Sequence, residues 1–334
     1  MFYLTLNIST NRVLYIPKGS TDSIITYLNK NNYDLNIIDT VVIKSLGYPQ
    51  SGWIDLKATK LKKYDFLYKL TKSKAAIRNV TLIPGETYYY FLKQISKKLN
   101  IPVKDLFVSY SKYAYKLDGN IIPQTYSLPL GMKSDDVIKH LINYSDKQYR
   151  KNAIKIFGTY DKKAWYRFLI IASIIQKEAA SKEEMPTVAS VIYNRIKKGM
   201  KLQMDGTLNY GKYSHVKVTR KMIKNDTTDY NTYKTTGIPS NPICAVEFEA
   251  IKSAIFPKKT NYLYFMKSVK GNKHVFTSNY KNHARVIRAV QKSKRFKKQV
   301  SNKKVKTKKY YKKLHNTTKK KTKSSVKNLW KDIK

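Results

Sequence analysis

The sequence lacks the residues that several common kinds of site require. It contains one cysteine, Cys244, so no intramolecular disulfide can form and no cysteine-based metal site exists. Its five histidines are scattered without the spacing of a zinc enzyme, so no metal site is expected. The glycine-rich patterns that cradle nucleotide phosphates are also missing, and no cofactor is expected.

Acidic residues are scarce as well. The chain has 21 Asp and Glu against 67 Lys and Arg, and its formal net charge is +46. A charge this extreme implies a polyanionic neighbour, for which nucleic acid, anionic lipid and anionic cell-wall polymer all qualify. Hydrophobic residues make up 42% of the 334 positions, so the chain as a whole is expected to fold, in two domains.

Long apolar runs are missing too, since no stretch reaches the roughly 20 apolar residues of a membrane span. Residues 1–8 are short and apolar, without the basic start or cleavage site of a signal peptide. We interpret them either as a first β-strand or as the remnant of a membrane anchor whose beginning lies outside this sequence.

A strand, a Pro/Gly turn and a helix follow one another twice in the first hundred residues, at 13–28 and, more weakly, at 80–99. Alternation and helical spacing predict further elements between them. We therefore expect an α+β fold, with a small α+β domain at residues 9–78 and a larger mixed α/β domain at residues 79–291.

An apolar helix that ends in one carboxylate is central to the interpretation. Isoleucines recur at helical spacing over residues 170–175, and Glu178 continues their stripe. Desolvation on such a face raises the pKa of an unpaired glutamate, which could then donate a proton at neutral pH. The alternative is a helix-end residue that bends out to water, as most helical glutamates do.

Two polar loops follow this helix in the sequence, at residues 202–211 and 229–242. Their amides, hydroxyls and aromatic rings are the groups that bind sugar hydroxyls and sugar rings, and we expect them to converge beside Glu178. Alternatively, they form turns that hold the long loops together. The residues concerned are Gln203, Asp205, Asn209, Asn231, Thr232 and Tyr233.

The helix boundaries around Glu178 also carry signals. Asp161 is expected to cap the helix that ends at Glu178. Ser181 and Glu184 have the spacing of a capping box, so Glu183 and Glu184 are interpreted as helix-start carboxylates rather than catalytic groups.

The last third of the sequence predicts a β-hairpin, a helix and a tail. Residues 261–266 and 273–280 have the aromatic density of paired, buried strands with a turn at residues 271–272, and a helix containing His283 follows. Residues 292–334 are rich in Lys and Arg and poor in apolar residues. We expect them to be disordered and to contact an anionic surface.

Several segments, taken with their order and spacing, resemble the endolytic murein transglycosylase family, also called MltG or YceG-like. The matching segments are residues 172–178 (Ala-Ser-Ile-Ile-Gln-Lys-Glu), 188–195, 199–205, 230–233, 237–239, 242–243, 262–265 and 274–276, with weaker matches at 83–86 and 123–126.

The resemblance implies a LysM-like module, a mixed α/β catalytic domain and a single N-terminal span at the periplasmic face of the bacterial inner membrane. It implies endolytic cleavage of the MurNAc-GlcNAc bond in nascent peptidoglycan, which leaves 1,6-anhydro ends and terminates strand elongation. Penicillin-binding proteins are the implied partners.

The resemblance also places the catalytic glutamate of the family on Glu178. Many members have a glutamate where this chain has Gln176, which leaves Glu178 as the only carboxylate of that segment. The residues expected to bind substrate are Gln203, Asp205, Asn231, Tyr233, Asn194 and Gln176.

Three other functions stay open at this point. The charge and the 28 tyrosines suit a nucleic-acid-binding protein, although no RNP, KH or helix-turn-helix pattern occurs and no specific nucleic acid is expected. A non-catalytic cell-wall binding module would bind peptidoglycan and leave it intact. A water-using muramidase would need a second carboxylate, and Asp205 is the natural candidate.

Overall fold

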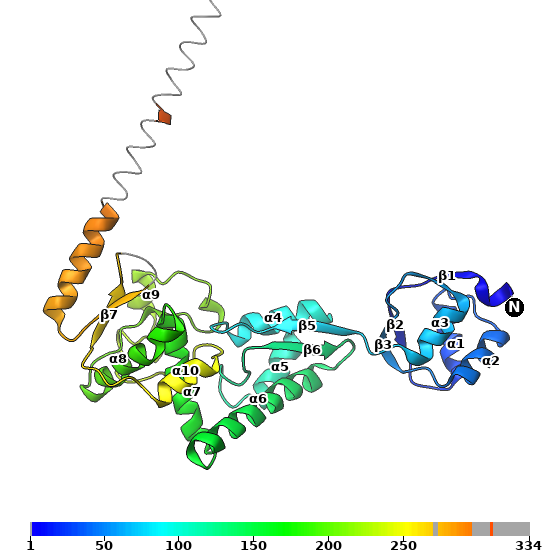
Figure 1. Cartoon of the computed structure of the whole chain (residues 1–334), viewed down its shortest axis with the longest axis horizontal. Helices are drawn as coiled ribbons and strands as arrows, with labels where there is room; N and C mark the ends of the chain where they lie inside the picture. Colours follow the sequence, from blue (N-terminus) through cyan, green and yellow to red (C-terminus); the bar gives the residue numbers. More distant parts are fainter. Residues whose placement is uncertain (1, 270–272, 296–307, 310–334) are drawn as a thin grey trace, which may run out of the picture.

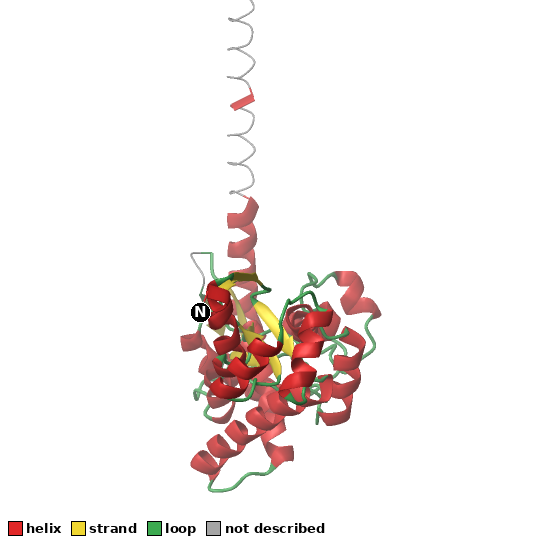
Figure 2. Ribbon diagram, turned by 90° about the vertical axis from the view of Figure 1, so that its right-hand side faces the viewer, coloured by secondary structure: helices red, strands yellow, loops and turns green. Residues whose placement is uncertain are grey.

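The computed structural model describes residues 2–269, 273–295 and 308–309. These residues form three units, each with its own hydrophobic core, that follow one another along an elongated molecule (Figure 1). The predicted α+β class is confirmed, because helices pack with small antiparallel sheets throughout (Figure 2).

The N-terminal unit pairs two short antiparallel ladders, β1 with β4 and β2 with β3, against three helices. Ser20 caps the first helix by accepting a hydrogen bond from the backbone N–H of Ser23. Its elements are η1 (Phe2–Thr5), β1 (Asn7–Ser9), β2 (Val13–Ile16), α1 (Thr21–Lys30), α2 (Ile37–Leu46), β3 (Gly52–Asp55), β4 (Lys60–Lys62) and α3 (Lys63–Lys72).

The first residues of the chain are fixed to this unit. Residues 2–5 form a short 3-10 helix, and the first strand covers only Asn7–Ser9. The interpretation of residues 1–8 as a first β-strand is therefore wrong for most of that segment. The Tyr3 hydroxyl donates to the buried Asp39 carboxylate at 2.6 Å, and the Lys63 ammonium lies 3.3 Å from the same carboxylate. A buried charge needs such partners, and here they tie η1 to α2 and α3.

The middle unit is built on the antiparallel pair β5 (Ile77–Thr81) and β6 (Thr125–Pro129), in register from Ile77 opposite Pro129 to Thr81 opposite Thr125. The helices of this unit are α4 (Tyr88–Leu99), α5 (Val103–Tyr113) and α6 (Ser134–Phe157).

Helix α6 joins the middle unit to the third. Its first half buries Val137, Ile138 and Leu141 in the core of the middle unit, and its second half buries Tyr149 and Ala153 in the next core. Residues 79–291 were expected to form one domain. They hold two cores that share this helix.

The third unit packs α7 against α8 and α10, with irregular loops and a hairpin around them. Strands β7 and β8 pair in antiparallel register, which confirms the predicted hairpin, although their side chains are half-buried or exposed rather than buried. The predicted turn residues 271–272 lie outside the described residues. The elements are α7 (Lys162–Glu178), η2 (Lys182–Glu184), α8 (Met185–Lys197), η3 (Asp205–Leu208), η4 (Gly211–Tyr213), α9 (Arg220–Asn225), α10 (Phe248–Ile255), β7 (Tyr264–Lys267) and β8 (His274–Thr277).

The predicted capping box is wrong. Ser181 makes no side-chain capping bond, and the segment after it is the 3-10 helix η2, with α8 beginning at Met185. Glu184 instead accepts hydrogen bonds from the backbone N–H of His274 and lies 2.8 Å from its ring Nδ1. This carboxylate therefore fastens the β7–β8 hairpin to the start of α8.

A final helix covers residues 280–295 and stands out from the body of the molecule (Figure 2). Residues 292–295, expected to begin a disordered tail, are instead helical. The rest of that tail, apart from residues 308–309, lies outside the described residues.

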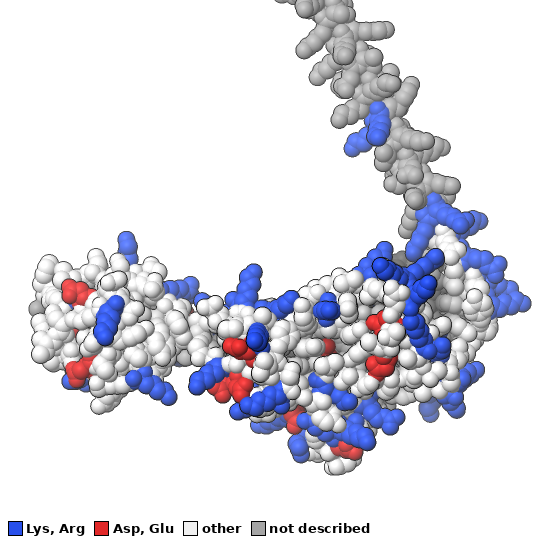
Figure 3. Space-filling model, turned by 180° about the vertical axis from the view of Figure 1, so that it is seen from behind, with Lys and Arg blue, Asp and Glu red and all other residues white. Residues whose placement is uncertain are grey.

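On the face shown in Figure 3, basic side chains are scattered along the molecule and gather at the base of this last helix. Within the described ranges, no helix combines the length and the hydrophobicity that a bilayer span requires.

Candidate active site

Helix α7 delivers Glu178 to the site. Asp161 caps its N-terminus, as predicted, by accepting from the backbone N–H groups of Lys163 and Ala164 at 2.7 and 3.1 Å. Ile174 and Ile175 in the last turns are fully buried. The backbone N–H of Ala179 closes the helix on the carbonyl of Ile175, so Glu178 is held at a rigid helix end.

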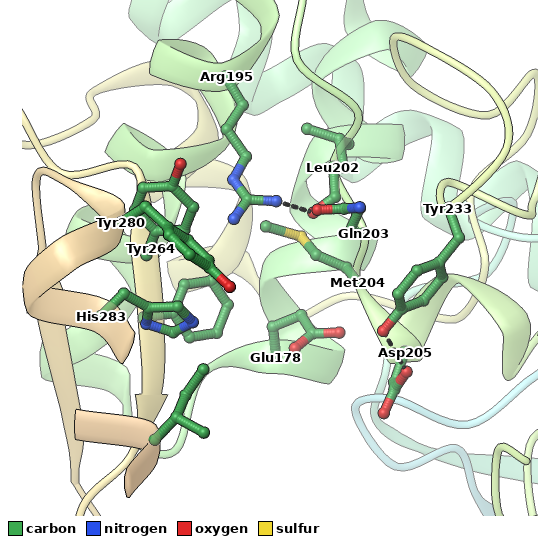
Figure 4. Close-up of a pocket in the computed structure, with 12 residues that line it drawn as sticks. Glu178, Arg195, Leu202, Gln203, Met204, Asp205, Tyr233, Tyr264, Tyr280 and His283 are labelled. Carbon is green, nitrogen blue, oxygen red and sulfur yellow. Dashed lines mark hydrogen bonds between the residues drawn. The ribbon is translucent and has the colours of Figure 1, made fainter. Parts of the chain in front are cut away.

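Glu178 lies in a pocket of about 340 Å³, between loops on one side and the hairpin and last helix on the other (Figure 4). Its volume falls within the range of ligand-binding pockets, about 300–1,000 Å³. The lining residues are Glu178, Arg195, Leu202, Gln203, Met204, Asp205, Tyr233, Tyr264, Phe265, Tyr280, His283 and Ile287.

Gly206 holds the Glu178 carboxylate in place. Its backbone N–H donates to Oε1 of Glu178 at 2.7 Å. A Cβ atom at position 206 would lie 2.8 Å from that oxygen and 2.8 Å from Cβ of Lys177. Only glycine allows the first turn of η3 to approach the end of α7 this closely.

The environment of Glu178 favours its protonated form. Burial is the main cause that raises the pKa of this carboxyl to about 7; the Gly206 N–H bond opposes it, and the nearby charge of Asp205 adds to it. Burial outweighs the hydrogen bond because a single N–H cannot replace the hydration of a carboxylate. At neutral pH the group can therefore both give and take a proton.

This pKa has a consequence for stability. Glu178 in the unfolded chain has a pKa of about 4.5, so between that value and about 7 the unfolded state loses the proton first. The free energy of unfolding therefore falls as the pH rises through this window, by about 3 kcal/mol in total.

The variant Glu178→Gln removes this titration and keeps an oxygen for the Gly206 N–H. We expect it to match the parent in chemical denaturation at pH 4 and to exceed it at pH 8. Equal stability at pH 8 would mean that Glu178 ionises as freely as a solvated glutamate.

Asp205 and Tyr233 form the loop side of the pocket. The Tyr233 hydroxyl donates to Oδ1 of Asp205 at 2.7 Å, and Asp205 is exposed to solvent. Burial and the two neighbouring carboxylates, Asp205 and Glu178, raise the pKa of Tyr233 above its ordinary range. Asp205 is thus a solvated carboxylate that holds a neutral phenol, in contrast to the half-buried Glu178.

Gln203 reaches the same pocket through an unusual backbone conformation. Its φ is +49°, in the left-handed region, and its backbone N–H donates to the carbonyl of Thr232. Its side chain is exposed. Of the residues expected to bind substrate, the structure brings Gln203, Asp205 and Tyr233 together around Glu178.

The other three expected binding residues do not line this pocket, and one of them, Asn231, was also expected to converge beside Glu178. Asn231 is fully buried, and its side-chain amide donates to the carbonyls of Ile223 and Asp226. Asn194 donates to the carbonyls of Thr260 and Tyr262.

Gln176, the third of them, accepts from the backbone N–H of Glu247 at 3.2 Å. Asn209 and Thr232 likewise hold chain segments together rather than lining the pocket. Asn209 donates to the carbonyls of Tyr213 and Val216, and Thr232 accepts from the backbone N–H of Met204 in the other polar loop. The alternative interpretation, in which polar side chains hold long loops together, describes Asn231, Asn209 and Thr232, whereas Asn194 and Gln176 make their bonds from helices α8 and α7.

Arg195 lines the pocket although its sequence context gave it no role. It is buried, and its guanidinium donates to the carbonyls of Leu263, Lys201 and Leu202 while lying 5.2 Å from the ring centroid of Tyr264. It therefore connects the loop side of the pocket to the hairpin side. In the part of the chain that the structure describes, no three His, Cys, Asp or Glu side chains converge as a metal site would need.

The sequence model of the YceG-like family matches residues 14–289, which is most of the chain. The chain belongs to the YceG-like family. The resemblance on residues 172–276 is thereby confirmed.

Two relatives of this YceG-like chain are named endolytic murein transglycosylase. That of Bacillus subtilis is 33% identical over 203 residues, which cover 58% of this chain and 53% of the relative. That of Streptococcus pneumoniae serotype 2 is 28% identical over 275 residues, which cover 80% and 48%. The chain thus spans about half the length of the curated relatives it matches.

A crystal structure of a YceG-like protein from Listeria monocytogenes has the same fold. It superposes with a TM-score of 0.53 at 24% identity, over 84% of this chain and 99% of the other. At that identity the likeness concerns the fold.

Proposed function

We propose that this YceG-like chain is a peptidoglycan lytic transglycosylase in which Glu178 is both the acid and the base. The observation that supports this most is the half-buried carboxyl of Glu178, with a pKa of about 7, at a pocket lined by polar and aromatic side chains. Its relatives named endolytic murein transglycosylase point to the same chemistry.

The reaction needs one group that changes roles. Protonated Glu178 gives its proton to the glycosidic oxygen as the bond from that oxygen to the anomeric carbon of MurNAc breaks. The 6-hydroxyl of the same MurNAc then bonds to the anomeric carbon, and its proton passes to the Glu178 carboxylate. The product is a 1,6-anhydro end, no water is consumed, and Glu178 regains its starting state. A pKa near neutrality suits both proton donation in the first step and proton acceptance in the second.

The sugar contacts of this proposal come from the loop side of the pocket. Gln203 offers an amide, and Tyr233 and Asp205 offer a ring face and hydrogen-bonding oxygens beside Glu178. Arg195 braces both sides of the pocket through the carbonyls that it binds.

Asp205 separates this mechanism from hydrolysis. In the proposed reaction Asp205 contacts the sugar and its charge raises the pKa of Glu178, but it transfers no proton. Asp205→Asn should therefore shift the alkaline limit of activity to lower pH and change the optimum rate by less than about 10-fold. If Asp205 activated water instead, the loss would be about 10²–10⁴-fold at every pH. The measurement is the pH dependence of sacculus solubilisation. Asp136→Asn, on the exposed first turn of α6, is the matched control.

We further propose that the chain acts outside the cytoplasm, where peptidoglycan lies, with penicillin-binding proteins as candidate partners. The N-terminal unit would serve as the LysM-like module that the resemblance implies. The large positive charge suits an anionic cell-wall surface.

Incubation of purified sacculi with the chain tests the proposed function. We expect soluble glycan fragments to be released by the parent protein. Binding to intact sacculi without release would instead indicate a cell-wall binding module, and salt-sensitive DNA binding without release would favour the nucleic-acid alternative.

A further inference from the structure

The last helix forms part of the pocket that contains Glu178. Tyr280, His283 and Ile287 lie three and four residues apart, on one face of helix 280–295, and all three line the pocket. Figure 4 shows His283 and Tyr280 on the side opposite Tyr233 and Asp205, with Glu178 between the two sides. A ligand bound over Glu178 would therefore contact both sides of the pocket.

The His283 ring is fixed by its neighbours. It stacks on the ring of Tyr264, with 5.0 Å between centroids and 22° between planes. Tyr280 packs edge-on against the same Tyr264 ring at 6.0 Å, and the Arg195 guanidinium lies 5.2 Å from its centroid. The orientation of the imidazole is therefore set by the hairpin and by α8 as well as by its own helix.

One nitrogen of this ring is buried without a partner. Among the described residues no hydrogen-bonding group reaches Nδ1 of His283. Burial and the charge of Arg195 both lower the pKa of this histidine, so the ring is neutral at neutral pH and carries one proton.

The location of that proton follows from Nδ1. A buried N–H group without an acceptor is rarer and more costly than a buried acceptor without a donor, so the proton belongs on Nε2. With Nδ1 buried, Nε2 is the nitrogen that faces the pocket (Figure 4). The site therefore presents one oriented N–H donor opposite Asp205.

We propose that His283 is a sugar-binding residue of this site, and that its Nε2–H donates to an oxygen of the glycan held over Glu178. This inference rests on the proposed function and adds the substrate contact made by the last helix. Hydroxyl and acetamido oxygens are the acceptors that a glycan offers to such a donor.

Three substitutions at position 283 test the donor and its place on the ring. Phenylalanine keeps the stacking on Tyr264 and removes both nitrogens. Glutamine places an amide nitrogen near the position of Nε2, whereas asparagine places one near Nδ1. We expect His283→Phe to weaken glycan binding about threefold to tenfold, the range for one neutral hydrogen bond. His283→Gln should recover part of the loss and His283→Asn should not.

Binding is measured by calorimetry with peptide-free glycan oligosaccharides, on the full chain carrying Glu178→Gln so that no turnover occurs. Thermal unfolding of each variant shows whether its fold is kept, and a long-range ¹H–¹⁵N spectrum of the free protein identifies the protonated ring nitrogen. A proton on Nδ1, or unchanged binding by His283→Phe, would overturn this proposal and leave the proposed function standing. A chain that binds no glycan with His283 intact would overturn both.

Discussion

Replacing Glu178 by glutamine is expected to lower the rate of glycan cleavage by about 10²–10⁴-fold, the usual contribution of a general acid-base group. The amide cannot protonate the leaving oxygen, yet it keeps the shape of the side chain and an oxygen for the Gly206 N–H, which donates at 2.7 Å. The loss should therefore appear in kcat while glycan binding and folding are kept.

Glu183→Gln is the matched control for this variant. Glu183 is exposed, lies five positions further along the chain and does not line the pocket, so the same chemical change there should leave the rate unaltered. A Glu178→Gln protein that retained near-parental activity would show that the acid is another group.

Adding one methyl group at Gly206 should have the next largest effect. In Gly206→Ala the new Cβ would lie 2.8 Å from Oε1 of Glu178 and 2.8 Å from Cβ of Lys177, closer than such atoms approach. Helix α7 is anchored in the core, so η3 has to move, and the Gly206 N–H bond to the carboxylate is lost. A displacement of this kind costs about 10²-fold in rate, because the acid no longer faces the glycosidic oxygen.

A second glycine separates this effect from a general loss of stability. Gly199 has a φ of +65° and no neighbouring atom within 4 Å of a new Cβ. Gly199→Ala should therefore lower stability by about 1–2 kcal/mol through backbone strain alone and leave kcat unchanged. Parental kcat in Gly206→Ala would contradict the role assigned to the contact.

The position of Glu178 on its helix could be predicted because the evidence for it is local, whereas its catalytic role was implied by the resemblance to the family. Apolar spacing places the residue on the buried face of a helix, and the cap at Asp161 sets where that helix begins. Both signals lie within the sequence of one helix, α7, and the structure contains both the apolar face and the cap.

The pocket lining was predicted only in part, because loop side chains have two uses that look alike in a sequence. Asn231 and Gln203 both occupy polar loops, but Asn231 is buried and binds the carbonyls of Ile223 and Asp226, while Gln203 lines the pocket. Composition favours neither use, and only the path of the backbone decides between them.

Arg195 and His283 could not be assigned because their roles depend on distant segments. Arg195 is held at the pocket by the carbonyls of Leu202 and of the distant Leu263, and His283 is placed by stacking on Tyr264. Gly206 resembles an ordinary turn glycine until the end of α7 is brought against it. These roles arise from contacts between distant segments, so the local periodicity of the sequence cannot predict them.

The chemistry of the new chain ends tests the central claim most directly. Purified glycan strands are digested with the parent protein, and the soluble fragments are weighed by mass spectrometry. If Glu178 acts alone as acid and then base, the fragments end in 1,6-anhydro-MurNAc, one water lighter than a reducing end. Fragments with reducing ends would contradict the account and would make Asp205 the second carboxylate of a hydrolase.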